Sequence, residues 1–203
     1  MSTRATTPGR YLKSVPVGTF VRVEDLPGTR QAAASAASRA AARGDLLPVR
    51  KGLYFKGVRT RYGMTAPGPV DIALEVIGRT GVGPAGYSAA RAFGLTTQLP
   101  ARPELAVAGP LPTGVPGVEL RRRNNMARRD LSHLEIALLE VLRDWERLSE
   151  EPITTLAKAV PSDTVDLDKV ERALRTERVP AARHRFEELV SARATLGTPN
   201  AAH

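Results

Sequence analysis

The chain of 203 residues contains no cysteine, so neither a disulfide framework nor a thiolate metal site is possible. Its three histidines, His133, His184 and His203, are far apart and form no H-x-x-x-H pair, which argues against a zinc site. We expect no metal and no cofactor. No apolar run approaches the roughly 20 residues that span a bilayer, and the N-terminal segment lacks a hydrophobic signal-peptide core. A cytoplasmic protein without membrane contact is therefore expected.

Acidic residues are scarce in the first 62 residues, and this asymmetry accounts for the net charge of +9. The segment has 12 Lys and Arg against three acids, whereas residues 63–203 have 18 of each sign. Because phosphate contacts need clustered cations, the asymmetry predicts a polyanion-binding domain at residues 1–62 and a neutral domain at residues 63–203. A basic N-terminal tail is the alternative.

The clearest helix of the basic segment lies between Thr29 and Gly44. Thr29 is a suitable N-cap, alanine fills the interior, and Gly44 is a typical C-terminal stop. One face of the helix carries alanines and the other carries polar side chains. In a major groove, glutamine can pair with adenine and arginine with guanine, so this helix is predicted to read DNA. The predicted contact residues are Arg30, Gln31, Ser35, Ser38 and Arg39.

Aromatic residues form only 4% of the chain, yet Tyr54 and Phe55 stand together in LLPVRKGLYFKG, residues 46–57. Cations surround them, and Gly52 offers a turn, which predicts a two-stranded hairpin. After a short helix, a strand, a tight helix and the long helix, such a hairpin is the wing of a winged helix-turn-helix. Its aromatics would pack on the long helix while its cations reach phosphates. The predicted phosphate contacts are Arg50, Lys51 and Lys56. An ordinary hairpin with a solvated charged face is the alternative.

Residues 63–203 are predicted to form a mixed α/β domain that ends in helices. The Gly- and Pro-rich segment Arg59–Pro69 is interpreted as a linker or domain boundary at its start. Short strands are expected at ELAVAG and VELRRRNN. The strongest helix is SHLEIALLEVLRDWERL, in which Ser132 and Glu135 form a capping box and Trp145 lies on the apolar face as a core residue. The predicted fold class is thus α+β, a winged helix-turn-helix followed by this domain.

A glycine motif in the second domain has the spacing of a phosphate-binding loop. Gly81, Gly83 and Gly86 match G-x-G-x-x-G, but the segment before them is predicted to be helical and Pro84 removes a backbone donor. We therefore interpret the motif as a turn. P-loop and protein-kinase motifs are absent from the sequence.

A second basic cluster, RRRNNMARR, lies at residues 121–129. One interpretation is a solvated strand end. The other is a contact with DNA that flanks an operator, or with an acidic or RNA-bound surface of a partner. The arginines of this cluster are Arg121, Arg122, Arg123, Arg128 and Arg129.

The segment TRQAAASAASRAAARGDLLPVRKGLYF resembles the N-terminal winged helix of the AbiE-type abortive-infection antitoxins. GPAGYSAARAFGLTTQLPA, the strand ELAVAG and the helix LSHLEIALLEVLRD resemble the C-terminal domain of the same family, in the same order. The resemblance runs from about Val17 to Trp145. It implies an antitoxin encoded beside a nucleotidyltransferase toxin, which the C-terminal domain counters. It also implies that the N-terminal domain binds inverted repeats of its own promoter, with a second copy on the same DNA, and represses the operon.

Two other functions stay open. One is an enzyme that neutralises the toxin by covalent modification, such as serine phosphorylation. The absence of recognisable kinase and P-loop motifs favours a binding protein without catalytic activity. The other is a plain winged-helix transcription factor whose second domain senses a ligand.

Overall fold

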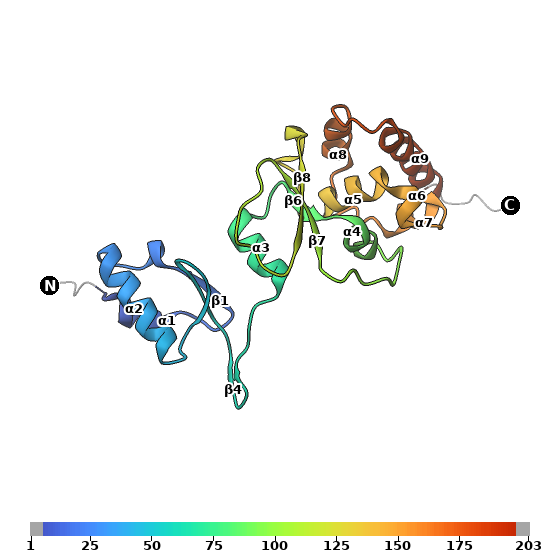
Figure 1. Ribbon diagram of the computed structural model, residues 1–203. Helices are drawn as coiled ribbons and strands as arrows, with labels where there is room; N and C mark the ends of the chain where they lie inside the picture. The colour runs from blue at the N-terminus through green and yellow to red at the C-terminus, as the bar shows by residue number, and fades with distance from the viewer. Residues whose placement is uncertain (1–5, 198–203) are drawn as a thin grey trace. The chain divides into compact units, whose positions relative to one another are not determined.

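The structure is a computed structural model and describes residues 6–197. The chain divides into two compact units, Met1–Glu75 (unit 1) and Val76–His203 (unit 2) (Figure 1). The predicted α+β fold class is confirmed, with helices and a small sheet first and an α/β region that ends in helices second. None of the helices in residues 6–197 is both long enough and apolar enough to cross a bilayer.

Unit 1 has the element order of a winged helix-turn-helix. Its three strands form an antiparallel sheet in the order β1-β3-β2. The tight helix expected around Glu24 is a single 3-10 turn, η1. The elements are α1 (Pro8–Ser14), β1 (Thr19–Arg22), η1 (Val23–Asp25), α2 (Arg30–Ala42), β2 (Leu47–Arg50) and β3 (Leu53–Lys56).

Helix α2 begins and ends where the sequence predicts. The Thr29 hydroxyl accepts a hydrogen bond from the backbone nitrogen of Ala32 at 3.3 Å. At the other end Gly44 adopts φ +71°, a left-handed conformation that favours glycine and closes the helix. The alanine face packs into the core, where side chains this small let the helix approach its neighbours closely. The buried alanines are Ala33, Ala36, Ala37 and Ala40.

The two aromatics of strand β3 lie on opposite faces of the sheet, because side chains alternate along a strand. Tyr54 packs against the apolar cluster that contains the α2 alanines, as predicted. Phe55 is buried on the other face, where its ring lies 5.1 Å from that of Phe20 on β1. The prediction that both aromatics pack on the long helix is therefore correct for Tyr54 and wrong for Phe55.

The segment predicted as a linker has regular structure. It contains the hairpin of β4 (Arg59–Thr60) and β5 (Gly63–Met64), and α3 (Pro69–Ile77) follows. The predicted boundary at residue 62 lies in the turn of this hairpin. Within unit 1, Arg22 of β1 donates from Nε to the Glu75 carboxylate at 2.9 Å and from Nη2 to the Glu75 carbonyl. These bonds attach α3 to the winged helix.

Unit 2 contains a three-stranded sheet in the order β6-β7-β8, in which β6 and β7 are antiparallel and β7 and β8 parallel. Helices α4 and α5 pack against this sheet, and α8 and α9 pack against α5 (Figure 1). The elements are β6 (Val82–Pro84), α4 (Gly86–Ala92), β7 (Glu104–Ala108), β8 (Glu119–Arg123), the 3-10 turn η2 (Met126–Arg128), α5 (His133–Arg143), α6 (Trp145–Leu148), α7 (Ile153–Ala159), α8 (Leu167–Leu174) and α9 (Pro180–Gly197).

Helix α5 is the centre of the unit 2 core. Its capping box is present: the Ser132 hydroxyl accepts from the Glu135 nitrogen at 3.3 Å, and the Glu135 carboxylate accepts from the Ser132 nitrogen at 2.7 Å. The helix breaks at Asp144, earlier than predicted, and α6 follows. Trp145 is buried, as predicted for a core residue.

The glycine motif is not the predicted turn. Gly83 lies in strand β6 and Gly86 begins helix α4, so the motif joins a strand to a helix. The sequence shows no strand there because β6 is only three residues long and includes a proline. Gly86 has φ +52° and lies so close to the Glu104 carboxylate that a Cβ would collide with it. The Glu104 carboxylate therefore leaves no room for a side chain at the start of α4.

Candidate functional site

The polar face of α2 is exposed to solvent in the described part of unit 1, residues 6–75. The helix has 13 residues, so the face is about 20 Å long at roughly 1.5 Å per residue. Its buried alanines fix which side points to the core, and the polar residues are exposed on the other side. The structure thus brings the predicted residues onto one surface, namely Arg30, Gln31, Ser35, Ser38 and Arg39.

The turn between β2 and β3 presents Arg50 and Lys51, both exposed. Gly52 follows them with φ +77°, the left-handed conformation that this tight turn needs. Its carbonyl accepts a hydrogen bond from the Val23 nitrogen at 3.0 Å. This bond fixes the turn next to η1, the segment that leads into α2. The wing turn is therefore attached to the segment that precedes α2.

Lys56, the third predicted wing cation, has a different partner. Its ammonium group donates to the carbonyl oxygens of Leu12 at 2.9 Å and Lys13 at 3.1 Å. These carbonyls belong to the last turn of α1, where a cation satisfies free acceptors and interacts favourably with the helix dipole. Lys56 therefore holds α1 to the sheet. This role differs from the predicted contact with a phosphate.

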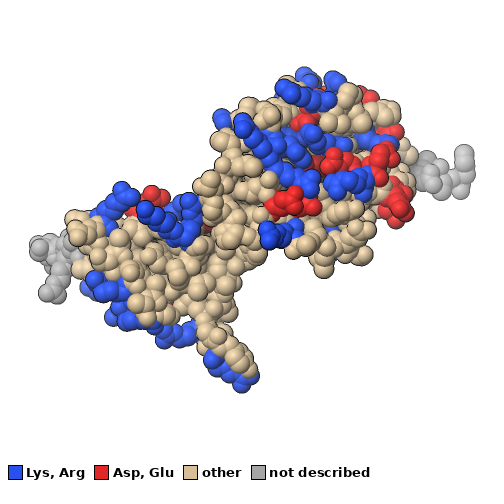
Figure 2. All heavy atoms as spheres, viewed as in Figure 1, with Lys and Arg blue, Asp and Glu red and all other residues tan. Residues whose placement is uncertain are grey.

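Unit 1 has a long stretch without any acid. Residues 46–70 contain five cations and no Asp or Glu, and the stretch covers both hairpins of the unit. In Figure 2 the β4–β5 hairpin extends from unit 1 with blue atoms at its end and no red atoms. A surface of this sign attracts polyanions. The five cations are Arg50, Lys51, Lys56, Arg59 and Arg61.

The second basic cluster does not form one exposed patch. Arg128 is fully buried, and the Arg123 side chain is only 17% exposed. Arg121 pairs with Glu104 at 2.7 Å. The interpretation in which these arginines contact DNA or a partner therefore fails for Arg128, whose side chain is fully buried, and does not suit the mostly buried Arg123. Arg122 and Arg129 are exposed.

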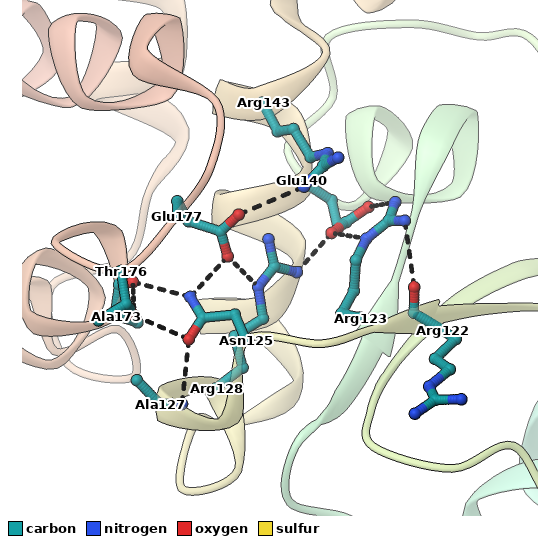
Figure 3. Close-up of polar contacts among 10 residues, drawn as sticks. All are labelled: Arg122, Arg123, Asn125, Ala127, Arg128, Glu140, Arg143, Ala173, Thr176 and Glu177. Carbon is teal, nitrogen blue, oxygen red and sulfur yellow. Dashed lines mark hydrogen bonds and ion pairs between the residues drawn. The ribbon is translucent and has the colours of Figure 1, made fainter.

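Arg123 and Arg128 belong to a buried ion-pair network (Figure 3). Both donate to the fully buried carboxylate of Glu140 on α5, Arg123 Nε at 2.8 Å and Arg128 Nη1 at 2.5 Å. Arg128 Nε also donates to Glu177 at 2.5 Å, and Arg143 pairs with Glu177 at 3.3 Å. The network joins β8, η2 and α5 to the loop between α8 and α9.

Asn125 completes the connection between η2 and the C-terminal helices. Its Nδ2 donates to the Glu177 carboxylate at 2.8 Å and to the Ala173 carbonyl at 2.9 Å (Figure 3). Its Oδ1 accepts from the Thr176 hydroxyl at 2.8 Å. Each contact joins one side of unit 2 to the other, which is the pattern of a structural network rather than of an open ligand site.

The network shifts the ionisation of its carboxylates. Burial alone would raise the pKa of Glu140, but the hydrogen bonds and charges of Arg123 and Arg128 lower that pKa below its ordinary value. Burial likewise opposes ionisation of Glu177, and Arg128 and Asn125 bring its pKa below the ordinary value. The hydrogen bond with Glu140 raises the pKa of Arg123. All these groups are charged at neutral pH.

Sequence reasoning did not find this network. Glu140 occupies a helix position whose neighbours are buried, and a charge at such a position is the one signal the sequence offers. Residues 6–197 contain no group of three or more His, Cys, Asp or Glu side chains that could hold a metal ion. Since the carboxylates of the network are already paired, it does not provide a free general acid or base.

No protein-family model matches the sequence. No curated protein matches it either. Among solved structures, the chain is similar to the crystal structure of the RV2827C protein from Mycobacterium tuberculosis, with a TM-score of 0.50 over 90% of this chain and 74% of that chain. The two sequences are 18% identical over this match. At that identity the likeness establishes a shared fold.

Proposed function

We propose that the chain is a DNA-binding repressor and antitoxin of the AbiE type, which acts in the cytoplasm. The observation that carries the DNA-binding half is one surface of unit 1. The exposed polar face of α2 and the basic turn at Arg50 and Lys51 lie on the same winged helix, in a unit whose net charge is +7 of the chain's +9. Winged helices use these two elements to contact base edges and phosphates.

The antitoxin half of the proposal rests on the sequence resemblance. The partner expected from the resemblance is a nucleotidyltransferase toxin, and unit 2 is the part assigned to counter it. Unit 2 has a net charge of only +2, against +7 for unit 1, so it is suited to a partner other than duplex DNA. On DNA, a second copy of the chain would occupy the other half of an inverted repeat.

The test separates repression from protection in the full chain. An Arg50→Ala/Lys51→Ala variant keeps unit 2 intact, and its substitutions lie on an exposed turn. We expect this variant to bind its own promoter more weakly than the wild type in a gel shift. It should still protect cells when the nucleotidyltransferase is expressed from an unrelated promoter.

Each half of the proposal has its own contradicting result. Full-length chain that fails to bind its promoter, under low-salt conditions that favour phosphate contacts, contradicts the repressor function. Loss of protection in the wing variant, with the protein still folded, contradicts the assignment of protection to unit 2. Toxin that carries a new covalent group after incubation with the chain would support the enzymatic alternative.

A further inference from the structure

The tip of the β4–β5 hairpin exposes an aromatic ring that has no core to join. Tyr62 is 83% exposed, more than any other large hydrophobic side chain in residues 6–197. The guanidinium of the neighbouring Arg61 lies 4.5 Å from the centre of the Tyr62 ring. An exposed aromatic and a cation at the end of a hairpin form a contact surface for an anionic partner with flat groups.

The hairpin is too short to be stable by strand pairing alone, and side chains fix its shape. The Thr60 hydroxyl donates to the Gly63 carbonyl at 2.8 Å across the turn. At the base, the Thr65 hydroxyl accepts from the Val58 nitrogen at 2.8 Å, and the Thr65 nitrogen donates to the Val58 carbonyl at 2.9 Å. These bonds make the tip a defined feature of the surface.

Arg59 attaches the hairpin to the predicted recognition helix. Its Nη2 donates to the carbonyl oxygens of Arg43 and Gly44, each at 2.9 Å, and these carbonyls lie at the C-terminal end of α2. The hairpin therefore has a fixed place relative to α2 inside unit 1. From Val58 to Arg61 the strand advances about 10 Å, three steps of roughly 3.3 Å each, so the tip lies well beyond the base of the hairpin.

The positive charge at the hairpin tip suits a contact with the minor groove of duplex DNA. No acid lies between residues 46 and 70, so nothing near the tip in sequence repels phosphates. The minor groove is about 6 Å wide, too narrow for a two-stranded ribbon with its side chains but wide enough for one arginine. Its narrow A·T segments have a strongly negative potential that attracts inserted arginines.

We propose that the β4–β5 hairpin is a second DNA-binding arm. In this arm Arg61 enters the minor groove beside the base pairs that α2 reads, and Tyr62 packs along the sugar edge. The inference rests on the proposed function and extends the same interface by a contact that the winged helix alone does not supply.

The test uses the full chain with Arg61→Ala and Tyr62→Ala, and Arg102→Ala as the matched control. Arg102 is also exposed but lies in unit 2, so its removal changes the net charge equally. Affinity for a labelled promoter duplex is measured by anisotropy. Arg61→Ala should weaken binding by about tenfold, the usual scale of one lost DNA contact, and Arg102→Ala should not.

A second measurement reports on the groove itself. Netropsin fills the minor groove at A·T pairs, and it should reduce the affinity of the wild-type chain more than that of Arg61→Ala. The proposal of a DNA-binding arm is overturned if Arg61→Ala and Arg102→Ala bind the promoter with equal affinity. It is also overturned if netropsin reduces the affinity of the wild type and of Arg61→Ala equally. If Arg50→Ala/Lys51→Ala still weakens promoter binding in that case, the proposed function stands without the arm. The proposal of the arm is also overturned if the full chain binds no promoter DNA, or if the hairpin tip binds only an acidic protein.

Discussion

Arg128 and Glu140 form a fully buried ion pair in the core of unit 2, with Arg128 Nη1 at 2.5 Å from Glu140 Oε1. Arg128 stands in a run of cations that looks like a surface cluster in the sequence, yet its guanidinium connects η2 to α5 and to Glu177. Placing a charge in a core is costly unless every partner is present. The pair therefore makes unit 2 depend on a few side chains from distant parts of the chain.

Glu140→Gln should destabilise unit 2 strongly. It removes the charge that compensates Arg123 and Arg128, and breaking a buried pair costs about 3–5 kcal/mol. Glu171→Gln is the matched control, because Glu171 forms an exposed pair with Arg175 that contributes at most about 1 kcal/mol. Urea unfolding followed by the fluorescence of Trp145, the single tryptophan, reports on unit 2. Equal unfolding midpoints for the two variants would contradict this energetic role.

Acid should destabilise unit 2 through the same carboxylates. Because the folded-state pKa values of Glu140 and Glu177 lie below the ordinary 4.5, their contribution to the free energy of unfolding is complete above about pH 4.5. It is lost as the pH falls through the lowered values. The free energy of unfolding, measured by urea titration at a series of pH values, should therefore fall below about pH 4.5.

The variant Glu177→Gln isolates that effect. It should have a lower free energy of unfolding at neutral pH and a shallower fall with acid, since one of the two linked groups is gone. Glu171→Gln, which removes a carboxylate of an exposed pair outside the network, is the control. A Glu177→Gln slope equal to that of the wild type would show that other carboxylates cause the acid sensitivity.

Removing Lys56 should change the stability of unit 1, whereas removing the wing cations Arg50 and Lys51 should change DNA binding. Lys56→Ala removes the ammonium that caps the Leu12 and Lys13 carbonyls, so it should lower the stability of unit 1 by about 1 kcal/mol. Arg50→Ala/Lys51→Ala should leave stability unchanged and flatten the salt dependence of promoter binding by about 0.9 per lost phosphate contact. Hydrogen exchange of α1 amides measures the first effect and anisotropy at several salt concentrations the second. If Lys56→Ala also flattens the salt dependence of promoter binding, Lys56 does contact a phosphate, as the sequence predicts.

The winged helix was predictable because its signals are local. Thr29 caps α2, Gly44 ends it, and the alanines repeat on one face, all within 16 residues of sequence. The same holds for α5, whose capping residues Ser132 and Glu135 are three positions apart. Such patterns depend on the backbone of one helix and need no knowledge of the rest of the fold.

The burial of Arg128 was not predictable in the same way. Its partner Glu177 is 49 positions away, so no local pattern distinguishes this arginine from its exposed neighbour Arg129. Strand β6 was missed for a related reason. A three-residue strand with Gly83 and Pro84 has weak strand propensity, and its place in the sheet depends on pairing with β7 and packing under α5.

Gln31→Ala should reduce sequence preference more than affinity for DNA in general. Gln31 is exposed in the first turn of α2, where a winged helix meets base edges, and a bidentate contact contributes about 1–3 kcal/mol of discrimination. The ratio of affinities for promoter and random duplexes should therefore fall by roughly 5- to 150-fold, while the salt slope stays the same.

Gln98→Ala provides the matched control for that measurement, because Gln98 is the other exposed glutamine in residues 6–197 and lies in unit 2. It should keep the wild-type ratio. If Gln31→Ala also keeps it, base recognition does not involve Gln31 and must be sought at Arg30 or Ser35, on the same face. If Gln31→Ala lowers both affinities equally, the residue contacts the backbone, since phosphate contacts weaken binding to all sequences alike.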